Sequence, residues 1–332
     1  MYNIRKKKVN ILITSASRKV GLIKAFKVAL KKEGGGKVIA ADISPLSAAF
    51  YFSDSFYLAP KDSDPFFIAK LLAVCKKRQI KLIVPTRDEE LIIFAENKEK
   101  FQKIGTEIMV SNPEAVDICF DKLKFLNFCK NNNFDSPKVY QLSDIKNKKV
   151  KFPVFLNDRF GKGSKKAFKA SNLDEVKAFL KIIKNPIIVD YIAQKEYTID
   201  LFADFFGNIV SVVPKERISV FGGESFVGKT VKNEILIDSA IKIANKLKLI
   251  GHNTIQCFFD GKTVKFIEVN PRYGGGATLG FAAGVNTPRF LIKTLKGDIL
   301  TSQIGRFKEG LIMMRYTEDF FSYEKKLKWS KK

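Results

Sequence analysis

The sequence has few residues of the kinds that bind metals through nitrogen or sulfur. Its 332 residues include one histidine, His252, and four cysteines. The cysteines are scattered with no C-x-x-C pair, which disfavours a zinc site built from cysteine and histidine. A Ser-His-Asp triad could use only His252, and we expect this residue in a loop or helix cap after Gly251 rather than as a base.

Long apolar runs and an export signal are also lacking. No stretch reaches the roughly 18 uninterrupted apolar residues of a membrane span. The apolar run Val9–Thr14, behind the basic N-terminus, is too short for a signal-peptide core. Together with the unpaired cysteines, these absences favour a reducing cytoplasm.

Acidic residues are scarce relative to basic ones. The chain has 59 Lys+Arg against 34 Asp+Glu, a formal net charge of +25, which at first suggests a nucleic-acid partner. Only ten of the basic residues are arginines, and lysines such as Lys24, Lys27 and Lys31 lie on what look like outward helix faces. They are not interleaved with aromatic residues in a block. The charge therefore disfavours a dedicated nucleic-acid surface and favours a solvated one that attracts anionic ligands.

The composition that is present is globular. Hydrophobic residues at 45% and charged residues at 28% exclude wholesale disorder, and the length predicts two domains or two to three smaller lobes. Over the first hundred residues, short apolar runs alternate with helical periodicity. The expected elements are strands Val9–Thr14, Val38–Ile43, Leu82–Pro85 and Glu107–Val110, and helices Lys19–Lys32, Phe66–Lys77 and Asp88–Phe101. This alternation predicts a Rossmann-like lobe with a parallel sheet and right-handed crossovers.

The first strand-to-helix turn argues against dinucleotide binding. It reads TSASRKVG over Thr14–Gly21 and lacks the first two glycines that let a backbone approach a pyrophosphate. Asp42 ends the second strand, where an NAD-binding fold would hold the ribose, or it caps the following loop. The hydroxyl-rich turn could still hold another anion at the helix N-terminus.

From Asp121 onward the pattern predicts mixed α+β structure, mostly antiparallel. The expected helices are Asp121–Asn131, Asn172–Ile183 and Ile235–Leu247, and the expected strands are Phe152–Leu156, Ile187–Tyr191, Glu196–Phe205, Ile209–Val213, Ile255–Phe259 and Val264–Val269. Turns at Gly207–Asn208 and Asp260–Gly261 predict two hairpins. Phe125 and Phe128 are expected in the core, and Phe320–Lys332 as a surface appendage.

The most informative string is FIEVNPRYGGG at Phe266–Gly276. The second predicted hairpin can place Gln256, Glu268 and Asn270 on one face, because Glu268 and Asn270 are two residues apart on a strand. Such hard oxygen ligands suit Mg²⁺. Arg272 adds a fixed positive fork, and the glycines offer backbone N–H groups to an anion. An ordinary strand end would explain a lone glutamate but not the full string.

This string resembles the E-x-N-P-R signature of the ATP-grasp superfamily. Nearly the whole chain is similar to the carbamoyl-phosphate synthase large subunit and to the amide-forming ligase of pyrrolysine biosynthesis. The segments AADISP and PTRDEEL resemble the domain before the grasp, and Asp121-Lys122 resembles its opening D-K. The resemblance implies an α/β chain: a Rossmann-like pre-ATP-grasp parallel-sheet domain (1–112), then a two-lobed α+β ATP-grasp domain with lobes 113–190 and 191–332, the last with a basic tail.

The resemblance also implies roles for particular residues. Asp190, Tyr191 and Ile192 would form the adenine hinge, and Glu196 would accept hydrogen bonds from the ribose. ATP phosphates would contact residues of the first lobe: Lys122, Asn157, Arg159, Gly161, Lys162 and Gly163. The catalytic and metal-binding residues would be Glu268, bridging two Mg²⁺ ions for which Mn²⁺ could substitute, together with Asn270, Gln256 and Arg272. The substrate would contact Arg217, Arg272, Tyr273, Gly274 and Gly275, under a closing loop Ser219–Lys232.

One position departs from the family pattern. Family members usually carry Lys or Arg on the strand before the glycine-rich loop, and this chain has Asn157, which supplies only a weaker neutral hydrogen bond. Three explanations stay open. Arg159 or Lys162 reaches the phosphates instead, nucleotide affinity is lower, or the protein has drifted from catalysis. The intact metal string argues against the last.

The implied reaction is an ATP-dependent carboxylate–amine ligation. A substrate carboxylate attacks the γ-phosphate to give an acyl phosphate and ADP, and an amine then displaces phosphate. Such phosphoryl transfer needs positioning and charge neutralisation more than a protein base, which suits a chain with one histidine. Alternatives are a carbamoyl-phosphate-forming enzyme, a nucleotide-binding regulatory protein and an RNA-binding module.

The expected partners are a small-molecule carboxylate and an amine, neither of which the sequence identifies. The sequence leaves a homodimer open. Asp88-Glu89-Glu90 opens a predicted helix and stabilises its N-terminus, or contacts the ATP-grasp part or the substrate.

Overall fold

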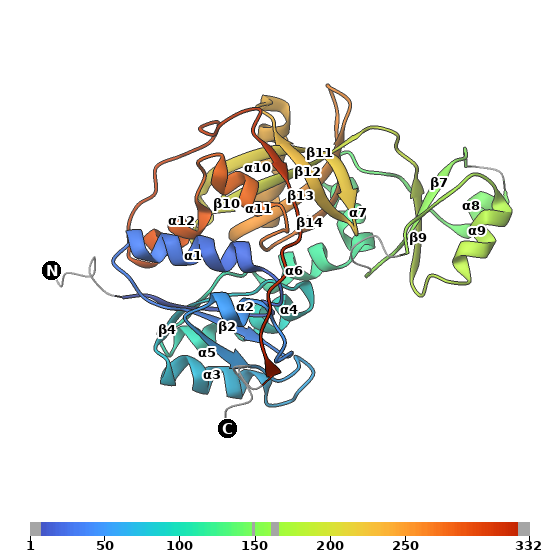
Figure 1. Ribbon diagram of the computed structural model, residues 1–332. Coiled ribbons are helices and arrows are strands. Elements are labelled where there is room, and N and C mark those ends of the chain that lie inside the picture. The colour runs from blue at the N-terminus through green and yellow to red at the C-terminus, as the bar shows by residue number, and fades with distance from the viewer. Residues whose placement is uncertain (1–7, 148–149, 161–165, 325–332) are drawn as a thin grey trace.

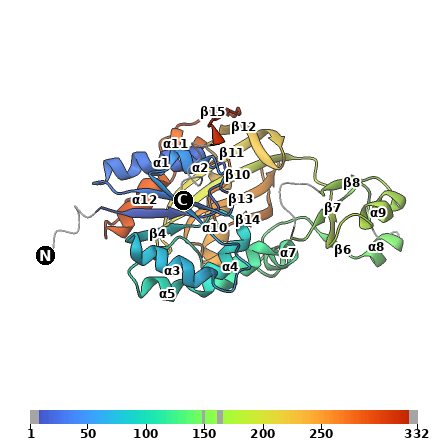
Figure 2. The ribbon, with the colours of Figure 1, turned by 60° about the horizontal axis from the view of Figure 1, so that its bottom comes forward.

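The strands of the protein form three sheets. The computed structural model describes residues 8–147, 150–160 and 166–324, and the sheets have five, four and six strands. Figure 1 shows the four-stranded sheet at one end of the molecule, apart from the other two, and Figure 2 shows the same separation from a second direction. Parallel sheet and antiparallel ATP-grasp-like sheets follow each other along the chain, as the sequence predicts.

The five-stranded sheet is parallel throughout, in the order β3-β2-β1-β4-β5. Its strands are β1 (Asn10–Ile13), β2 (Val38–Asp42), β3 (Ser55–Leu58), β4 (Ile80–Val84) and β5 (Glu107–Ile108). Its helices are α1 (Val20–Lys32), α2 (Ala49–Phe52), α3 (Phe67–Lys77), α4 (Asp88–Glu96) and α5 (Lys98–Gln102). The central strand β1 is apolar and fully covered at Ile11, Leu12 and Ile13, because helices lie on both faces of such a sheet.

Two expectations for this part were wrong in detail. The predicted helix Asp88–Phe101 is two helices divided at Asn97, whose side-chain amide donates to the Ile93 carbonyl at 2.8 Å and ends α4. The sequence pattern also missed α2 and the edge strand β3. β3 has only half-buried or exposed residues and no clean alternation of apolar and polar side chains, so it carries little periodic signal.

Helices α6 (Pro113–Phe120) and α7 (Lys122–Asn131) lead from the parallel sheet to the rest of the chain. The Asp121 carboxylate caps α7 by accepting from the backbone N–H groups of Leu123 and Lys124, as expected for a helix start. Phe125 is buried and Phe128 packs against the same core, which confirms both predictions. The pattern missed α6, an eight-residue helix that abuts α7 directly.

The four-stranded sheet is antiparallel in the order β6-β9-β7-β8. Its elements are β6 (Val139–Tyr140), α8 (Leu142–Lys146), β7 (Val154–Asp158), β8 (Phe168–Ala170), α9 (Leu173–Leu180) and β9 (Pro186–Asp190). It has a small core of its own, in which Val154, Leu156, Val176 and Ile188 are buried.

The six-stranded sheet is antiparallel in the order β14-β13-β10-β11-β12-β15. Its strands are β10 (Lys195–Ala203), β11 (Ile209–Phe221), β12 (Glu224–Thr230), β13 (Gly251–Phe259), β14 (Val264–Asn270) and β15 (Ile312–Met314). Helix α10 (Glu234–Leu247) packs in one core with the apolar side chains of the sheet, and α11 (Ala277–Ala282) and α12 (Thr287–Leu295) follow β14. Neighbouring strands are connected by the predicted turns at Gly207–Asn208 and Asp260–Gly261.

Two further expectations are corrected here. Most of the predicted closing loop Ser219–Lys232 is a hairpin made by the end of β11 and by β12, with a turn at Gly222 and Gly223, which both adopt positive φ. His252 is neither a loop residue nor a cap: it lies in β13, is 1% exposed, and pairs with Phe202 of β10. Strand β13 therefore begins at Gly251, before the apolar run from Ile255 that predicted it. Its next residues are polar and face other polar groups, so they do not show the apolar pattern of a strand.

The first domain and the six-stranded sheet share a core. Phe26 of α1 packs edge-on against Tyr273 at 5.8 Å, and both belong to one buried cluster with Ala277 of α11. The C-terminal segment runs from β15 back to α2 (Figure 1), where Phe320 lies 4.6 Å from the Tyr51 ring. The expected appendage is therefore packed at Phe320. Among the described helices, none is long and apolar enough to cross a membrane.

Candidate functional site

The six-stranded sheet has one apolar and one polar face. Side chains alternate along each strand, so Tyr197, Ile199 and Leu201 of β10 face the core with α10. The residues between them face the other way. There Thr198 lies opposite Gln256 of β13, which lies opposite Glu268 of β14. The register thus brings the predicted metal-binding residues together on one open face.

Glu268 is the centre of the predicted metal cluster. Its Oε1 accepts from Gln256 Nε2 at 2.7 Å and from Asn270 Nδ2 at 3.0 Å. Both amides therefore already contact the carboxylate, and each would present its oxygen to a cation after rotating. One carboxylate and two carboxamides form the hard-oxygen donor set that Mg²⁺ prefers, so these residues fit that ion. Among the described residues there is no cluster of three or more His, Cys, Asp or Glu that could hold a metal.

Arg272 lies beside this cluster and is held by the first domain. Its Nε and Nη2 donate to the two Asp88 oxygens at 2.7 and 2.6 Å, and Nη2 also donates to Asn270 Oδ1 at 3.1 Å. Burial opposes the charge of Arg272, but Asp88 outweighs it and raises the pKa of Arg272. Asp88 opens α4, so the predicted acidic helix start does contact the ATP-grasp part. Planar, two-point pairing of this kind fixes the guanidinium in place.

Glu90, two residues after Asp88, is a buried residue that holds segments of the first domain together. It is 2% exposed, and it accepts from the hydroxyls of Thr14 and Ser15 at 2.8 and 2.9 Å and from the Thr86 N–H at 2.9 Å. Burial raises the pKa of Glu90, and these donors oppose the rise. Asp42 accepts from the Ser17 N–H at 2.6 Å and from the Ser44 N–H at 2.9 Å, so it holds the first turn and caps the loop after β2, which is one of its two predicted roles.

A buried charge pair, which sequence reasoning missed, lies behind the glycine loop Gly274–Gly276. Lys215 Nζ is 2.5 Å from Asp200 Oδ2 and donates to the Gly276 carbonyl at 3.1 Å. Burial lowers the pKa of Lys215 while Asp200 opposes this; burial also opposes ionisation of Asp200, but Lys215 and His252 keep its pKa below the ordinary range. Working out the strand register of the hairpin predicted at Gly207–Asn208 would have placed Asp200 and Lys215 close together.

Tyr273 was expected to contact substrate, but its side chain is buried. Its ring stacks on His252 at 4.1 Å, and its hydroxyl accepts from Thr287 at 3.3 Å. His252 Nε2 lies 3.7 Å from Asp200 Oδ1, and burial lowers the pKa of His252 against the pull of Asp200. Tyr273 therefore anchors the start of the glycine loop, and its neighbours Gly274 and Gly275 keep the predicted position beside Arg272.

The predicted ribose residue Glu196 is also paired. It lies 3.0 Å from Arg217 Nε, and Arg217 donates further to Thr198 Oγ1 at 3.2 Å and to the Gly223 carbonyl at 2.9 Å. Burial raises the pKa of Glu196, partly offset by Arg217 and reinforced by the negative charge of Glu268. Glu196, Arg217 and Glu268 thus belong to one electrostatic neighbourhood.

The remaining predicted ATP-binding residues lie around the four-stranded sheet. Asn157 is half-buried in β7 and pairs with Ile187 of β9. Arg159 forms an ion pair with Asp121 at 2.5 Å, and its carbonyl accepts from the Lys122 N–H at 3.3 Å. Arg159 is therefore committed to the start of α7. Gly161, Lys162 and Gly163 lie outside the described residues.

The predicted hinge follows β9. The Asp190 carboxylate accepts from the Tyr140 hydroxyl at 2.6 Å and from the Lys138 N–H at 3.0 Å. Tyr191 is 37% exposed, with Lys169 4.4 Å from its ring centre. Asp190 ends β9, and Tyr191 and Ile192 begin the short connection to β10 between the four-stranded and six-stranded sheets.

Two family descriptions match this chain. Residues 11–109 match the PylC-like N-terminal domain, and residues 183–319 match the ATP-grasp domain found in a biosynthetic pathway with the Ter operon. The chain therefore carries a PylC-like N-terminal domain followed by an ATP-grasp domain. This confirms the resemblance that the E-V-N-P-R string indicates.

Known proteins and solved structures are similar to this chain over most of its length. The carbamoyl phosphate synthase large chain of Thermoplasma volcanium is 25% identical over 298 residues, which are 81% of this chain and 28% of that protein. The chain thus spans about a quarter of the length of such relatives. Biotin carboxylase from Campylobacter jejuni superposes with a TM-score of 0.72 at 18% identity, over 92% of this chain and 75% of that one. L-amino acid ligase from Bacillus licheniformis gives 0.71 at 15% identity, over 92% and 78%. These two likenesses show the fold.

Proposed function

We propose that the protein is an ATP-dependent carboxylate–amine ligase that forms an amide through an acyl phosphate, with release of ADP and phosphate. The observation that carries the proposal is the cluster of Gln256, Glu268 and Asn270 on the polar face, in hydrogen-bond contact with Arg272. Carboxylate and amide oxygens next to a fixed guanidinium suit phosphoryl transfer, which depends on charge neutralisation and alignment.

ATP would lie between the four-stranded and six-stranded sheets. The connection Asp190–Ile192 would meet the adenine, and Glu196 would accept from the ribose, exchanging part of its contact with Arg217. Lys122 would contact phosphates, together with Asn157 and the segment containing Gly161, Lys162 and Gly163. Arg159 would act through Asp121, by fixing the start of α7, since its guanidinium is already engaged there.

The chain's own residues would position the acid for attack. Glu268, Asn270 and Gln256 would hold Mg²⁺, two ions in our proposal. When bound, Mg²⁺ would neutralise negative charge on the ATP phosphates. Arg272 would hold the substrate carboxylate and then the transferred phosphoryl group, beside the N–H groups of Gly274 and Gly275. The amine then attacks the acyl carbon and phosphate leaves. Mn²⁺ would substitute for Mg²⁺.

The ion pair Lys215–Asp200 would hold the glycine loop in place beside these residues. Its hydrogen bond to the Gly276 carbonyl holds the glycine loop from behind, and burial of both side chains, 4% exposed each, excludes water from that support. Because all four cysteines are free and buried, we place the reaction in the reducing cytoplasm, and a homodimer is compatible with the proposal.

A second candidate is a phosphorylating enzyme of the carbamoyl-phosphate synthase type. The 25% identity to a carbamoyl phosphate synthase large chain favours it. This enzyme would consume ATP with bicarbonate and ammonia alone, so ADP formation without an organic acid would identify it.

The test is an ADP-release screen over carboxylate–amine pairs, with bicarbonate and ammonia as one pair and with Glu268→Ala as blank. The proposal predicts acid-dependent and amine-dependent ADP release that falls at least about 10²-fold in Glu268→Ala. Equal release by the folded variant would overturn it. Circular dichroism and the melting temperature show that the variant is folded.

A further inference from the structure

Basic side chains from three separate parts of the chain gather over the glycine loop. A Cβ added to Gly275 would lie 2.5 Å from Glu224 Oε2 and 3.1 Å from Arg315 Nη1, so the β11–β12 hairpin and the C-terminal segment cover this loop. Glu224 pairs with Arg315. Burial opposes the charge of Glu224, yet Arg315, Arg18 and Lys19 together lower its pKa. The first turn of the first domain therefore faces the same space.

The carboxylates near these cations are already engaged by other groups. Asp88 pairs with Arg272, and Glu224 pairs with Arg315. Glu268 accepts from Gln256 and Asn270, and Glu89 pairs with Arg87. The other two acids near Lys19 serve the turn itself. Glu90 accepts from Thr14, Ser15 and Thr86, and Asp42 accepts from the N–H groups of Ser17 and Ser44.

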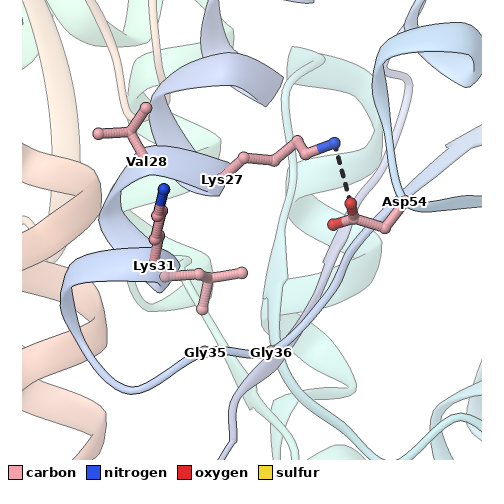
Figure 3. A pocket seen from close by; sticks show the side chains of 7 residues that line it. Lys27, Val28, Lys31, Gly35, Gly36 and Asp54 are labelled. Atoms are coloured by element: carbon pink, nitrogen blue, oxygen red, sulfur yellow. Dashed lines mark ion pairs between the residues drawn. The ribbon is translucent and has the colours of Figure 1, made fainter.

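Lys19 is half-buried and has no ion pair among the described residues, whereas its neighbour Arg18 is exposed. Its Nζ donates to the Ser15 carbonyl at 3.1 Å, and in the part of the chain that the structure describes no carboxylate lies within ion-pair distance of it. The opposite end of α1 gives a contrast: Lys27 borders an open hollow beside Lys31, Gly35 and Gly36, and there it is paired with Asp54 at 2.9 Å (Figure 3).

Lys19 and Arg272 are like charges on the two sides of the seam between the domains. Burial, and then the positive charge of Arg272, lower the pKa of Lys19. The seam is tight, since a Cβ on Gly21 of α1 would lie 3.1 Å from the Thr278 methyl group of α11. Two like charges held close in partly buried surroundings are unfavourable unless an anion lies between them.

We propose that Lys19 is a substrate-binding residue, and that Lys19 and Arg272 together bind an acid that carries a second anionic group besides the carboxylate that reacts. The inference rests on the proposed function. The reacting carboxylate loses its charge when it becomes an acyl phosphate, so a cation that serves only binding requires a group that does not react. The first domain thus selects a dicarboxylate or a phosphorylated acid over a simple monocarboxylate.

Melting temperatures at constant ionic strength test this inference without turnover. A ligand that binds the folded state raises the melting temperature, and at a given concentration the rise is larger for a ligand that binds more tightly. The probes are glutarate, its monoamide glutaramate, and inorganic phosphate, each titrated against the full-length wild type. We expect glutarate to bind about tenfold more tightly than glutaramate, as befits one charge-assisted contact. Stronger stabilisation by phosphate than by glutarate would identify the second group as a phosphate.

The variants are Lys19→Met, Lys19→Arg, and Lys32→Met on the exposed end of the same helix as a matched control. Lys19→Met should lose the preference for glutarate or phosphate, Lys19→Arg should keep most of it, and Lys32→Met should keep it all. An unchanged preference in Lys19→Met overturns the inference, as does equal stabilisation of the wild type by glutarate and glutaramate with none by phosphate.

A separate titration with MgATP keeps the two proposals distinguishable. If MgATP stabilises the wild type and Lys19→Met equally, ATP binding is independent of Lys19, as we expect. If MgATP stabilises neither, the proposed ligase function fails while the anion titrations still report on Lys19. If Lys19→Met loses its response to MgATP as well as to the anions, Lys19 serves the nucleotide and this inference is wrong.

Discussion

Two polar clusters lie on the same face of the six-stranded sheet, and they differ in what satisfies them. Gln256, Glu268 and Asn270 are half-buried and hydrogen-bond mainly among themselves. Lys215 and Asp200 are buried as an ion pair that also supports the Gly276 carbonyl. The first cluster can exchange its contacts for a cation at little cost. The second cannot, because breaking a buried pair leaves a charge uncompensated.

The same face of the six-stranded sheet thus carries both the proposed ligand-binding residues and the residues that position them. The proposed ligand-binding residues Gln256, Glu268 and Asn270 lie on β13 and β14, where water and ligand can reach them. The positioning residues Lys215 and Asp200 lie beneath the glycine loop that follows β14. Substitutions in the first cluster should therefore change activity with little change in stability, and substitutions in the second should change stability first.

The largest expected effect is on activity, from Glu268→Gln. The variant keeps the shape and both hydrogen-bonding neighbours but loses the charge, so we expect ADP release to fall about 10²–10³-fold with a melting temperature within a few degrees of wild type. Steady-state ADP release over a range of Mg²⁺ concentrations measures this. Glu216→Gln is the matched control, since Glu216 pairs with Lys195 and Lys229 rather than with this cluster. Equal losses in both variants would contradict the assignment.

The next effect is on stability, from Lys215→Met. Removing the lysine leaves Asp200 buried without its partner, which should cost about 3–5 kcal/mol of the free energy of unfolding in urea. The double variant Lys215→Met/Asp200→Leu should recover much of that loss. Lys229→Met, on the neighbouring strand, is the control and should lie close to wild type. A double variant no more stable than the single one would show that the buried pair is not what matters here.

Asp88→Asn should have a moderate effect that reaches both domains. It weakens the two-point contact to Arg272. We expect the free energy of unfolding to fall by about 1.5–3 kcal/mol, as for hydrogen bonds to charged groups. It should also raise the KM for the acid more than that for ATP. Asp64→Asn, which removes a surface pair with Lys70, is the control. If the KM values for acid and ATP rise together, Asp88 orders the whole site rather than Arg272 alone.

The smallest effect is a pH dependence at Asp121. Burial opposes the charge of this carboxyl, but Arg159 and the N–H groups of Lys124 and Leu123 hold its pKa below the ordinary value. Its contribution is therefore complete above an unfolded-state pKa of about 4 and disappears as pH falls through the lower folded-state value. Asp121→Asn keeps an oxygen that can cap α7 but loses the charge that pairs with Arg159, so it should cost about 0.5–1 kcal/mol at pH 7. The difference from wild type should shrink below pH of about 4. A difference constant from pH 7 to 2, measured by urea unfolding, would contradict this. Asp117→Asn is the exposed control.

The sequence predicted the regular parts of the fold and the half-buried cluster. Alternating strands and helices identify the parallel sheet, and the two-residue spacing of Glu268 and Asn270 places them on one face. The predicted turn at Asp260–Gly261 identifies the hairpin, but the pairing of Gln256 with Glu268 depends on the longer loop Asp260–Thr263 and on a register shift between Gln256 and Cys257.

What escaped prediction depends on contacts between distant segments. The Arg272–Asp88 pair joins residues 184 positions apart, and no local pattern reveals it. From the sequence, His252 is predicted in a loop or cap and Tyr273 at the substrate. Both side chains carry polar atoms, so the sequence does not indicate that the fold buries them against each other. Lys19 reads as one more surface lysine, and only the docking of α1 on α11 brings it near Arg272. The domain limits and the ATP contacts of Asn157 stay predictions.

The central claim is that the acid's carboxylate attacks ATP. It is tested most directly by following oxygen from a substrate acid labelled with ¹⁸O in its reacting carboxylate, using the acid–amine pair that gives the fastest ADP release. The account predicts that each phosphate released carries one ¹⁸O from that carboxylate, seen as an isotope shift in its ³¹P resonance. Phosphate without label, formed together with ADP and amide, would contradict the acyl phosphate and with it the proposed function.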